Sequence, residues 1–240
     1  MNSKPTHRAG ISTGEMDKPA DESSDSEVKH FGAVLGRSDE LSEAILAILS
    51  DSDFNPSPRG QASFSMCGVS MEHGSAIRLL IASGYATAAI SLMRLQFEAV
   101  VRAMWLLYAS SDLDIATLAA PLSSASERAA KNLPTANAMI DHIGRLAGTS
   151  APAQAHQMLV HFRDVQMKAL NSFVHAGIHP LRRHTEGYPF QLILQVLQTS
   201  NALTTMAGMT LAILTADEAV TTPMSRIQRT FEDCLPPLQR

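Results

Sequence analysis

The sequence has few aromatic residues, only two cysteines and no long apolar run. Aromatic residues make up 5% of its 240 positions, which is few for a β-sandwich. Cys67 and Cys234 lie far apart, with no CxxC motif and no disulfide framework, and the N-terminus lacks the apolar core of a signal peptide. We therefore expect a cytoplasmic protein. No apolar stretch reaches the length of a membrane-spanning helix, so we expect no membrane association.

The chain also lacks an excess of basic residues. Its 19 Lys and Arg against 23 Asp and Glu give a net charge of −4, which argues against nucleic-acid binding by bulk charge. Negative charge concentrates in the first fifty residues, and residues 1–29 have almost no apolar content. We predict a disordered acidic tail over residues 1–30 and a single helical domain over residues 31–240.

The composition that is present favours helices. Hydrophobic residues make up 45% of the chain, Ala, Leu, Met, Gln and Ser are abundant, and no strand alternation or hairpin turn is visible. The sequence therefore predicts an all-α, multi-helix bundle with long central helices. We expect helices from near Ser38, over 71–82, 85–109, two short ones within 112–131 and 134–147, then 152–176, 188–215 and 223–234.

The helix expected over 85–109 carries three charges within an apolar sequence. Arg94, Glu98 and Arg102 are spaced i, i+4, i+8 and therefore form one stripe. Two cations around one carboxylate leave an unpaired positive charge, which is costly to bury without a partner. The stripe either holds an anion such as a phosphate or links helices through backbone carbonyls and another carboxylate, for instance Asp164 or Asp141.

The second informative segment lies at the end of the helix expected over 152–176. Asn171 and His175 share a helix face, and His179 and Arg182 follow within a few residues. A histidine near neutral pH is suited to act as general acid or base in phosphodiester cleavage. The alternative interpretation is a helix C-terminal cap followed by a solvated basic turn.

Together these two segments resemble HEPN-type proteins. That family pairs a helix of buried charges with a later helix ending in Arg-polar-x-x-x-His, and here the pentapeptide from Asn171 to His175 is similar to the polar-x-x-x-His part. Leu170 stands where the family has arginine. The resemblance implies an all-α component of a bacterial defence or toxin–antitoxin system, in which a homodimer acts on RNA or a nucleotide without metal.

The resemblance also assigns roles to seven residues. It implies catalytic roles for His175, Asn171 and Arg102, with Arg94 or Arg102 replacing the missing arginine. It implies anion-binding or supporting roles for Arg94, Glu98, His179 and Arg182. The alternative function is a non-catalytic interaction protein, of immunity or antitoxin type, with a structural Arg-Glu-Arg network and a protein partner.

Other chemistries have weaker support in the sequence. His175 and His179 have the spacing of a metal pair, but Gly177 and Pro180 interrupt the helix between and after them. A three-histidine site would need His73 or His142 as a further ligand. We expect no metal and no cofactor. The methionines of the 188–215 helix favour a core position, with a homodimer face as the alternative.

Overall fold

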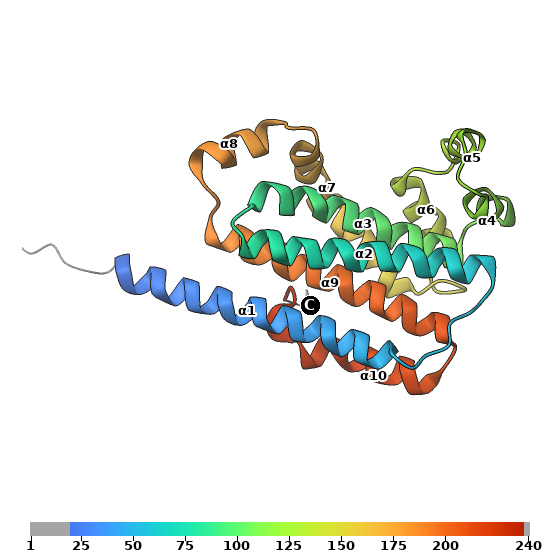
Figure 1. Ribbon diagram of the computed structural model, residues 1–240, viewed down its shortest axis with the longest axis horizontal. Helices are drawn as coiled ribbons and strands as arrows, with labels where there is room; N and C mark the ends of the chain where they lie inside the picture. Colours follow the sequence, from blue (N-terminus) through green and yellow to red (C-terminus); the bar gives the residue numbers. More distant parts are fainter. Residues whose placement is uncertain (1–19, 238–240) are drawn as a thin grey trace, which may run out of the picture.

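The computed structural model describes residues 20–237, and within that range the chain forms α-helices and one short 3-10 helix (Figure 1). No β-strand occurs among these residues, which confirms the all-α prediction. The helices are α1 (Ala20–Leu49), α2 (Pro58–Ala82), α3 (Ala86–Tyr108), α4 (Asp112–Ala119), α5 (Ser124–Ala130), α6 (Ala136–Leu146), α7 (Ala153–Val174), α8 (Ile178–Glu186), α9 (Phe190–Thr215) and α10 (Glu218–Thr230), with the 3-10 turn η1 at Glu232–Cys234.

Two long helices, α3 and α9, form the centre of the bundle. Helix α9 packs against α1, α2, α3 and α10, and α3 packs against α2, α6, α7 and α9. Both are apolar around most of their circumference, so each can bury several faces at once. In Figure 1, α8 lies at one end of the bundle, and α4 and α5 lie at the other. No described helix combines the length and apolarity needed to cross a membrane.

Helix α1 begins much earlier than predicted. Ser38, the expected first-turn cap, lies inside the helix and is fully buried. Its hydroxyl donates to the Val34 carbonyl at 2.7 Å and accepts from Asn201 Nδ2 at 2.7 Å, so its hydrogen bonds are satisfied there. The helix includes residues 20–30, which the sequence assigned to the acidic tail, and its first turns project past the bundle (Figure 1). The tail predicted for residues 1–19 lies outside the described residues.

Helix α2 also starts earlier than residue 71. Ser57 caps it by accepting from the Gly60 backbone N–H, and Pro58 occupies the first turn, where its missing N–H costs nothing. The small Ser and Gly side chains in the first half of α2 allow close packing against α3. The Ser63 hydroxyl, for example, donates to the Ala103 carbonyl at 2.9 Å.

Three helices, rather than the predicted two, fill residues 112–147. Ser111 and Ser123 each begin a helix with a reciprocal capping box, so α4 and α5 are separate short helices divided at Pro121. Helix α6 follows the cap formed by Thr135. The stop predicted near residue 176 is confirmed, because α7 ends at Val174.

A closed group of polar side chains lies between α2, α3 and α9. Gln96 is fully buried, and its Nε2 donates to the Ser200 carbonyl at 3.0 Å and to Thr204 Oγ1 at 3.1 Å. Its Oε1 accepts from Ser200 Oγ at 2.8 Å. Gly74 of α2 leaves room for this group, since a Cβ there would lie 2.8 Å from Gln96 Nε2. We call Gln96, Ser200 and Thr204 the core polar network.

Candidate functional site

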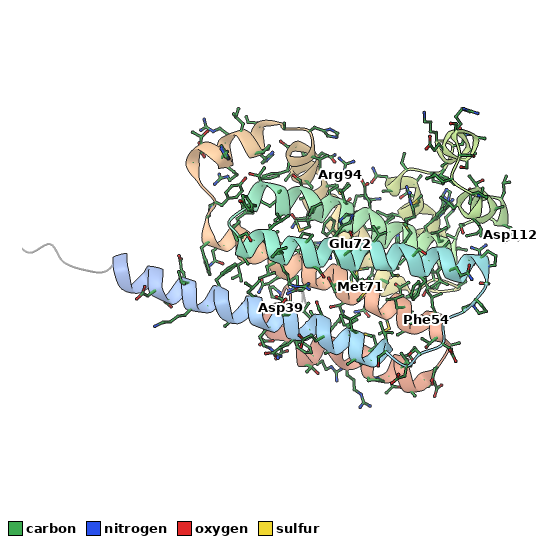
Figure 2. The ribbon with its side chains drawn as sticks, in the orientation of Figure 1. Asp39, Phe54, Met71, Glu72, Arg94 and Asp112 are labelled. Carbon is green, nitrogen blue, oxygen red and sulfur yellow. The ribbon has the colours of Figure 1, made fainter. Side chains whose placement is uncertain are left out.

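Three of the residues singled out in the sequence meet where α3 passes the end of α7. Arg94 Nε donates to Glu98 Oε1 at 2.9 Å, and Arg94 Nη1 lies 3.4 Å from His175 Nε2. Figure 2 shows Arg94 on the side of α3 toward the α7–α8 end of the bundle. We call Arg94, Glu98 and His175 the Arg94 cluster. It joins the two sequence segments that carried the functional prediction.

The end of α7 fixes the position of His175. This residue is the C-cap, and its backbone N–H donates to the Asn171 carbonyl at 3.1 Å. The chain then reverses through Ala176 at φ 51°. Gly177 follows, where a Cβ would lie 2.6 Å from Ser172 Oγ and would displace this hydroxyl, which accepts from the His179 backbone N–H at 3.1 Å. The imidazole is thereby held at the surface beside α3.

The charges in the Arg94 cluster are only partly balanced. The Arg94 and Glu98 side chains are 22% and 34% exposed, so their pairing is half-shielded from water. Glu98 offsets the charge of Arg94 and orients its guanidinium toward His175. Arg102 lies one turn further along the same stripe, half-buried, and among the described residues it has no hydrogen-bond or ion-pair partner. The positive charge left over on the stripe is therefore that of Arg102.

The structure places Arg94, rather than Arg102, against His175. Asn171 is exposed one turn before His175, and its side chain makes no hydrogen bond to other described residues. The His179 ring instead lies 6.1 Å from the Phe173 ring, measured between centroids. In the described part of the chain, neither the His179 nor the Asn171 side chain is hydrogen-bonded to a side chain of the cluster.

Arg182 is occupied elsewhere. It forms an ion pair with Glu186 at 2.6 Å on the exposed surface of α8, so its charge is already offset. The two carboxylates considered as partners of the stripe are paired with a different arginine. Asp141 and Asp164 both accept from Arg163, at 3.3 Å and 2.8 Å. Within the described part of the chain, the stripe is not tied to either carboxylate.

Leu170 has a structural reason to be apolar. It is 2% exposed and belongs to the hydrophobic core, on the face of α7 turned toward the bundle interior. An arginine at this position would have to bury a charge without a partner. The cation beside His175 therefore comes from α3, where Arg94 supplies it.

Metal binding and thiol chemistry find no support in residues 20–237. No group of three or more His, Cys, Asp or Glu side chains in this range could hold an ion, and the helix breaks between His175 and His179. His142 accepts instead from the Trp105 indole N–H at 3.3 Å. Burial raises the pKa of Cys67 to about 12 and that of Cys234 to about 11, so both remain neutral thiols at physiological pH.

Sequence reasoning missed a cavity between α3, α7, α9 and α10. It has a volume of about 290 Å³ and none of the cluster residues line it. Met206 and Met209, interpreted from the sequence as core residues, both line this space. The signal in the sequence was the density of methionine, but it did not reveal which helices would meet.

Comparison with protein families identifies the family of this chain. Residues 67–237 match the model of a family described as Family of unknown function (DUF6988), a range that includes the Arg94 cluster and the cavity but not α1. No curated protein and no solved structure matches the chain. Because the match covers well over half of the residues, the chain belongs to DUF6988.

Proposed function

We propose that this protein is a HEPN-like component of a bacterial defence or toxin–antitoxin system that acts on RNA or a nucleotide at the Arg94 cluster. One observation carries the proposal, namely the 3.4 Å approach of Arg94 Nη1 to His175 Nε2 in a pair oriented by Glu98. An arginine beside a surface histidine supplies two groups that metal-independent phosphodiester cleavage can use, a cation for the phosphate and a general acid or base. The link to defence systems rests on the resemblance described above.

The geometry suggests how cleavage would proceed. A phosphate oxygen of the substrate accepts hydrogen bonds from the Arg94 guanidinium, and Arg102 provides the uncompensated charge nearby. Once the Arg94 guanidinium donates to the phosphate instead of to His175, the lone pair of His175 Nε2 is free and removes the proton of the ribose 2′-hydroxyl, whose oxygen attacks phosphorus. The bond to the 5′ oxygen then breaks, leaving a 2′,3′-cyclic phosphate. The departing oxygen takes up a proton from a histidine, that of the same site or of the second copy in the expected homodimer.

A second candidate function is a non-catalytic interaction protein. Two observations favour it: Leu170 is buried where the HEPN motif has arginine, and Glu98 already offsets the charge of Arg94. In this reading the cluster only joins α3 to the end of α7. A protein partner would then take the place of RNA.

Cleavage of total RNA in the presence of EDTA distinguishes the two functions. We expect the purified protein to cleave RNA, and His175→Ala and Arg94→Gln to lose about 10²- to 10⁴-fold in rate, the usual contribution of a general acid or base. His184→Ala, which changes an exposed histidine of α8, is the matched control and should cleave normally.

Binding measurements complete the test. Intact RNA together with a gel shift that disappears in Arg102→Ala would indicate an anion-binding protein without catalysis. Cleavage that survives in His175→Ala would contradict the proposed chemistry. Absence of both cleavage and RNA binding would favour the interaction protein.

A further inference from the structure

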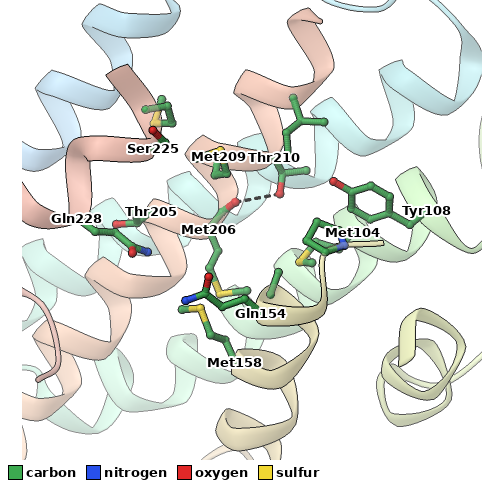
Figure 3. Close-up of a pocket in the computed structure, with 14 residues that line it drawn as sticks. Met104, Tyr108, Gln154, Met158, Thr205, Met206, Met209, Thr210, Ser225 and Gln228 are labelled. Atoms are coloured by element: carbon green, nitrogen blue, oxygen red, sulfur yellow. Dashed lines mark hydrogen bonds between the residues drawn. The ribbon is translucent and has the colours of Figure 1, made fainter. Parts of the chain in front are cut away.

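The cavity between α3, α7, α9 and α10 has the properties of a second binding site. It has a volume of about 290 Å³, at the small end of the range for small-molecule pockets, and none of its fourteen lining residues is charged. Figure 3 shows its walls, which come from all four helices. Five of the lining side chains are methionines: Met104, Met158, Met206, Met209 and Met224.

The polar groups around this cavity divide into two kinds. The hydroxyls of Thr205 and Thr210 donate to carbonyls of their own helix, both at 2.9 Å, so toward a ligand they can act only as acceptors. Tyr108, Gln154 and Gln228 differ, because their side chains have no hydrogen-bond partner among the described residues. In Figure 3 the Tyr108 hydroxyl is directed across the cavity toward Thr210 of α9.

The lining selects against charged ligands. Desolvation raises the pKa of Tyr108, so its hydroxyl stays protonated and acts as a neutral donor or acceptor. An ion among the methionines would lose part of its hydration and gain no opposite charge, since the exposed lining residues Gln154 and Gln228 lie at the open side and are neutral. Methionine side chains are flexible and polarisable, and they adapt to apolar rings and chains of different shape.

We propose that this cavity binds a small neutral molecule whose apolar part lies among the methionines and whose single polar group bonds to Tyr108, Gln154 or Gln228. The site is independent of the proposed function. It uses the C-terminal end of α3 and the N-terminal end of α7, whereas the Arg94 cluster uses the opposite end of each.

Two fluorescent probes with the same ring system test this proposal. N-phenyl-1-naphthylamine is neutral and carries one N–H, whereas 1-anilinonaphthalene-8-sulfonate adds a sulfonate to the same rings. We expect the neutral probe to bind the full-length protein saturably at one site, and the sulfonate to bind at least tenfold more weakly. Equal affinity for the two probes, or no saturable binding of the neutral one, would overturn the proposal.

Substitutions then locate the probe. Ala155→Phe fills the cavity from α7 and should abolish binding, whereas Gln157→Phe, on the exposed face of the same helix, should leave it unchanged. Tyr108→Phe removes only the hydroxyl and should weaken binding by about 2- to 10-fold, the effect of one neutral hydrogen bond. Tyr108→Phe also tests the site if circular dichroism shows that Ala155→Phe does not fold. Unchanged affinity in both Ala155→Phe and Tyr108→Phe would place the probe elsewhere and overturn the proposal.

Discussion

Helix α3 carries two polar groups that differ in how completely they are satisfied. On its inner face, Gln96 uses both amide atoms within the core polar network. On its outer stripe, Arg94 and Glu98 bond to each other and approach His175, while Arg102 has no partner among the described residues. The inner group is complete within the protein. The outer one has donors left over, and a ligand can use them.

Solvent accounts for the difference. A buried donor or acceptor without a partner costs about 1–3 kcal/mol of stability, so the hydrogen bonds of an interior polar group need to be satisfied within the protein. The Arg94 and Glu98 side chains are 22% and 34% exposed, and water can hydrate what the protein leaves unpaired there. We infer that the inner network stabilises the fold and that the outer stripe contributes little stability. This difference can be tested by substitution.

The largest loss of stability is expected for a substitution in the core polar network. Gln96→Ala removes a fully buried side chain, leaves a cavity between α3 and α9, and takes away the partner of the Ser200 hydroxyl. We expect the free energy of unfolding to fall by about 3 kcal/mol, as for other large-to-small core substitutions. Urea denaturation followed by circular dichroism measures it. Gln195→Ala, on the exposed face of α9, should change stability by less than about 0.5 kcal/mol.

A loss below about 1 kcal/mol for Gln96→Ala would contradict the distinction between the two faces. It would mean that the remaining hydroxyls of Ser200 and Thr204 rearrange without cost. The core polar network would then be an adaptable part of the interior.

A pair of half-buried arginines gives the next test. Arg59 Nη1 donates to the Leu106 carbonyl at 2.7 Å and to the Ser110 carbonyl at 3.0 Å, and so caps the end of α3. Its side chain is 30% exposed, and we expect Arg59→Gln to cost about 1.5 kcal/mol after allowing for solvent screening. Arg102→Gln removes a guanidinium that has no partner in the described part of the chain, and it should change the free energy of unfolding by less than about 0.5 kcal/mol.

The same two variants separate stability from binding. If the stripe binds phosphate, Arg102→Gln should weaken an RNA gel shift while Arg59→Gln leaves it intact once folding is confirmed. A destabilisation of Arg102→Gln equal to that of Arg59→Gln would show that the stripe is structural.

Local patterns predicted much of this arrangement. The i, i+4 spacing predicted that Arg94 and Glu98 would pair, and Gly177 with Pro180 predicted where α7 ends. The starts of α1 and α2 were missed for a physical reason. The turns of α2 that contain Ser and Gly have weak intrinsic helix propensity and become helical because they pack against α3. The first turns of α1 project past the bundle (Figure 1), with residues 25–30 exposed, and the Ser and acidic residues there show no apolar periodicity.

Long-range geometry was beyond local patterns. Which arginine meets His175 depends on where α7 crosses α3, and that crossing is set by core contacts such as the stacked rings of Phe97 and Phe162, 4.1 Å apart. The cavity depends in the same way on side chains from four helices. No spacing within one helix encodes either arrangement.

The smallest effect on stability is expected for two serines of α2. Their substitution tests whether every interior polar group needs a hydrogen-bond partner. Ser63 and Ser70 are both fully buried and lie two turns apart on the same helix. The Ser63 hydroxyl donates to the Ala103 carbonyl at 2.9 Å, whereas the Ser70 hydroxyl has no hydrogen-bond partner within residues 20–237. We expect Ser63→Ala to lower the free energy of unfolding by about 1 kcal/mol, the net value of a typical hydrogen bond.

Ser70→Ala should leave the free energy of unfolding unchanged or raise it slightly, because it removes a hydroxyl that is desolvated without a compensating hydrogen bond. Paired urea titrations of the two variants measure the difference, and each serves as control for the other because residue type, helix and burial are the same. A loss near 1 kcal/mol in both would show that Ser70 has a partner, such as a buried water, and that the interior is fully closed. A loss in Ser63→Ala alone would show that one unpaired hydroxyl is tolerated even there, so an unpaired group indicates a binding site only where a ligand can reach it, as at Arg102.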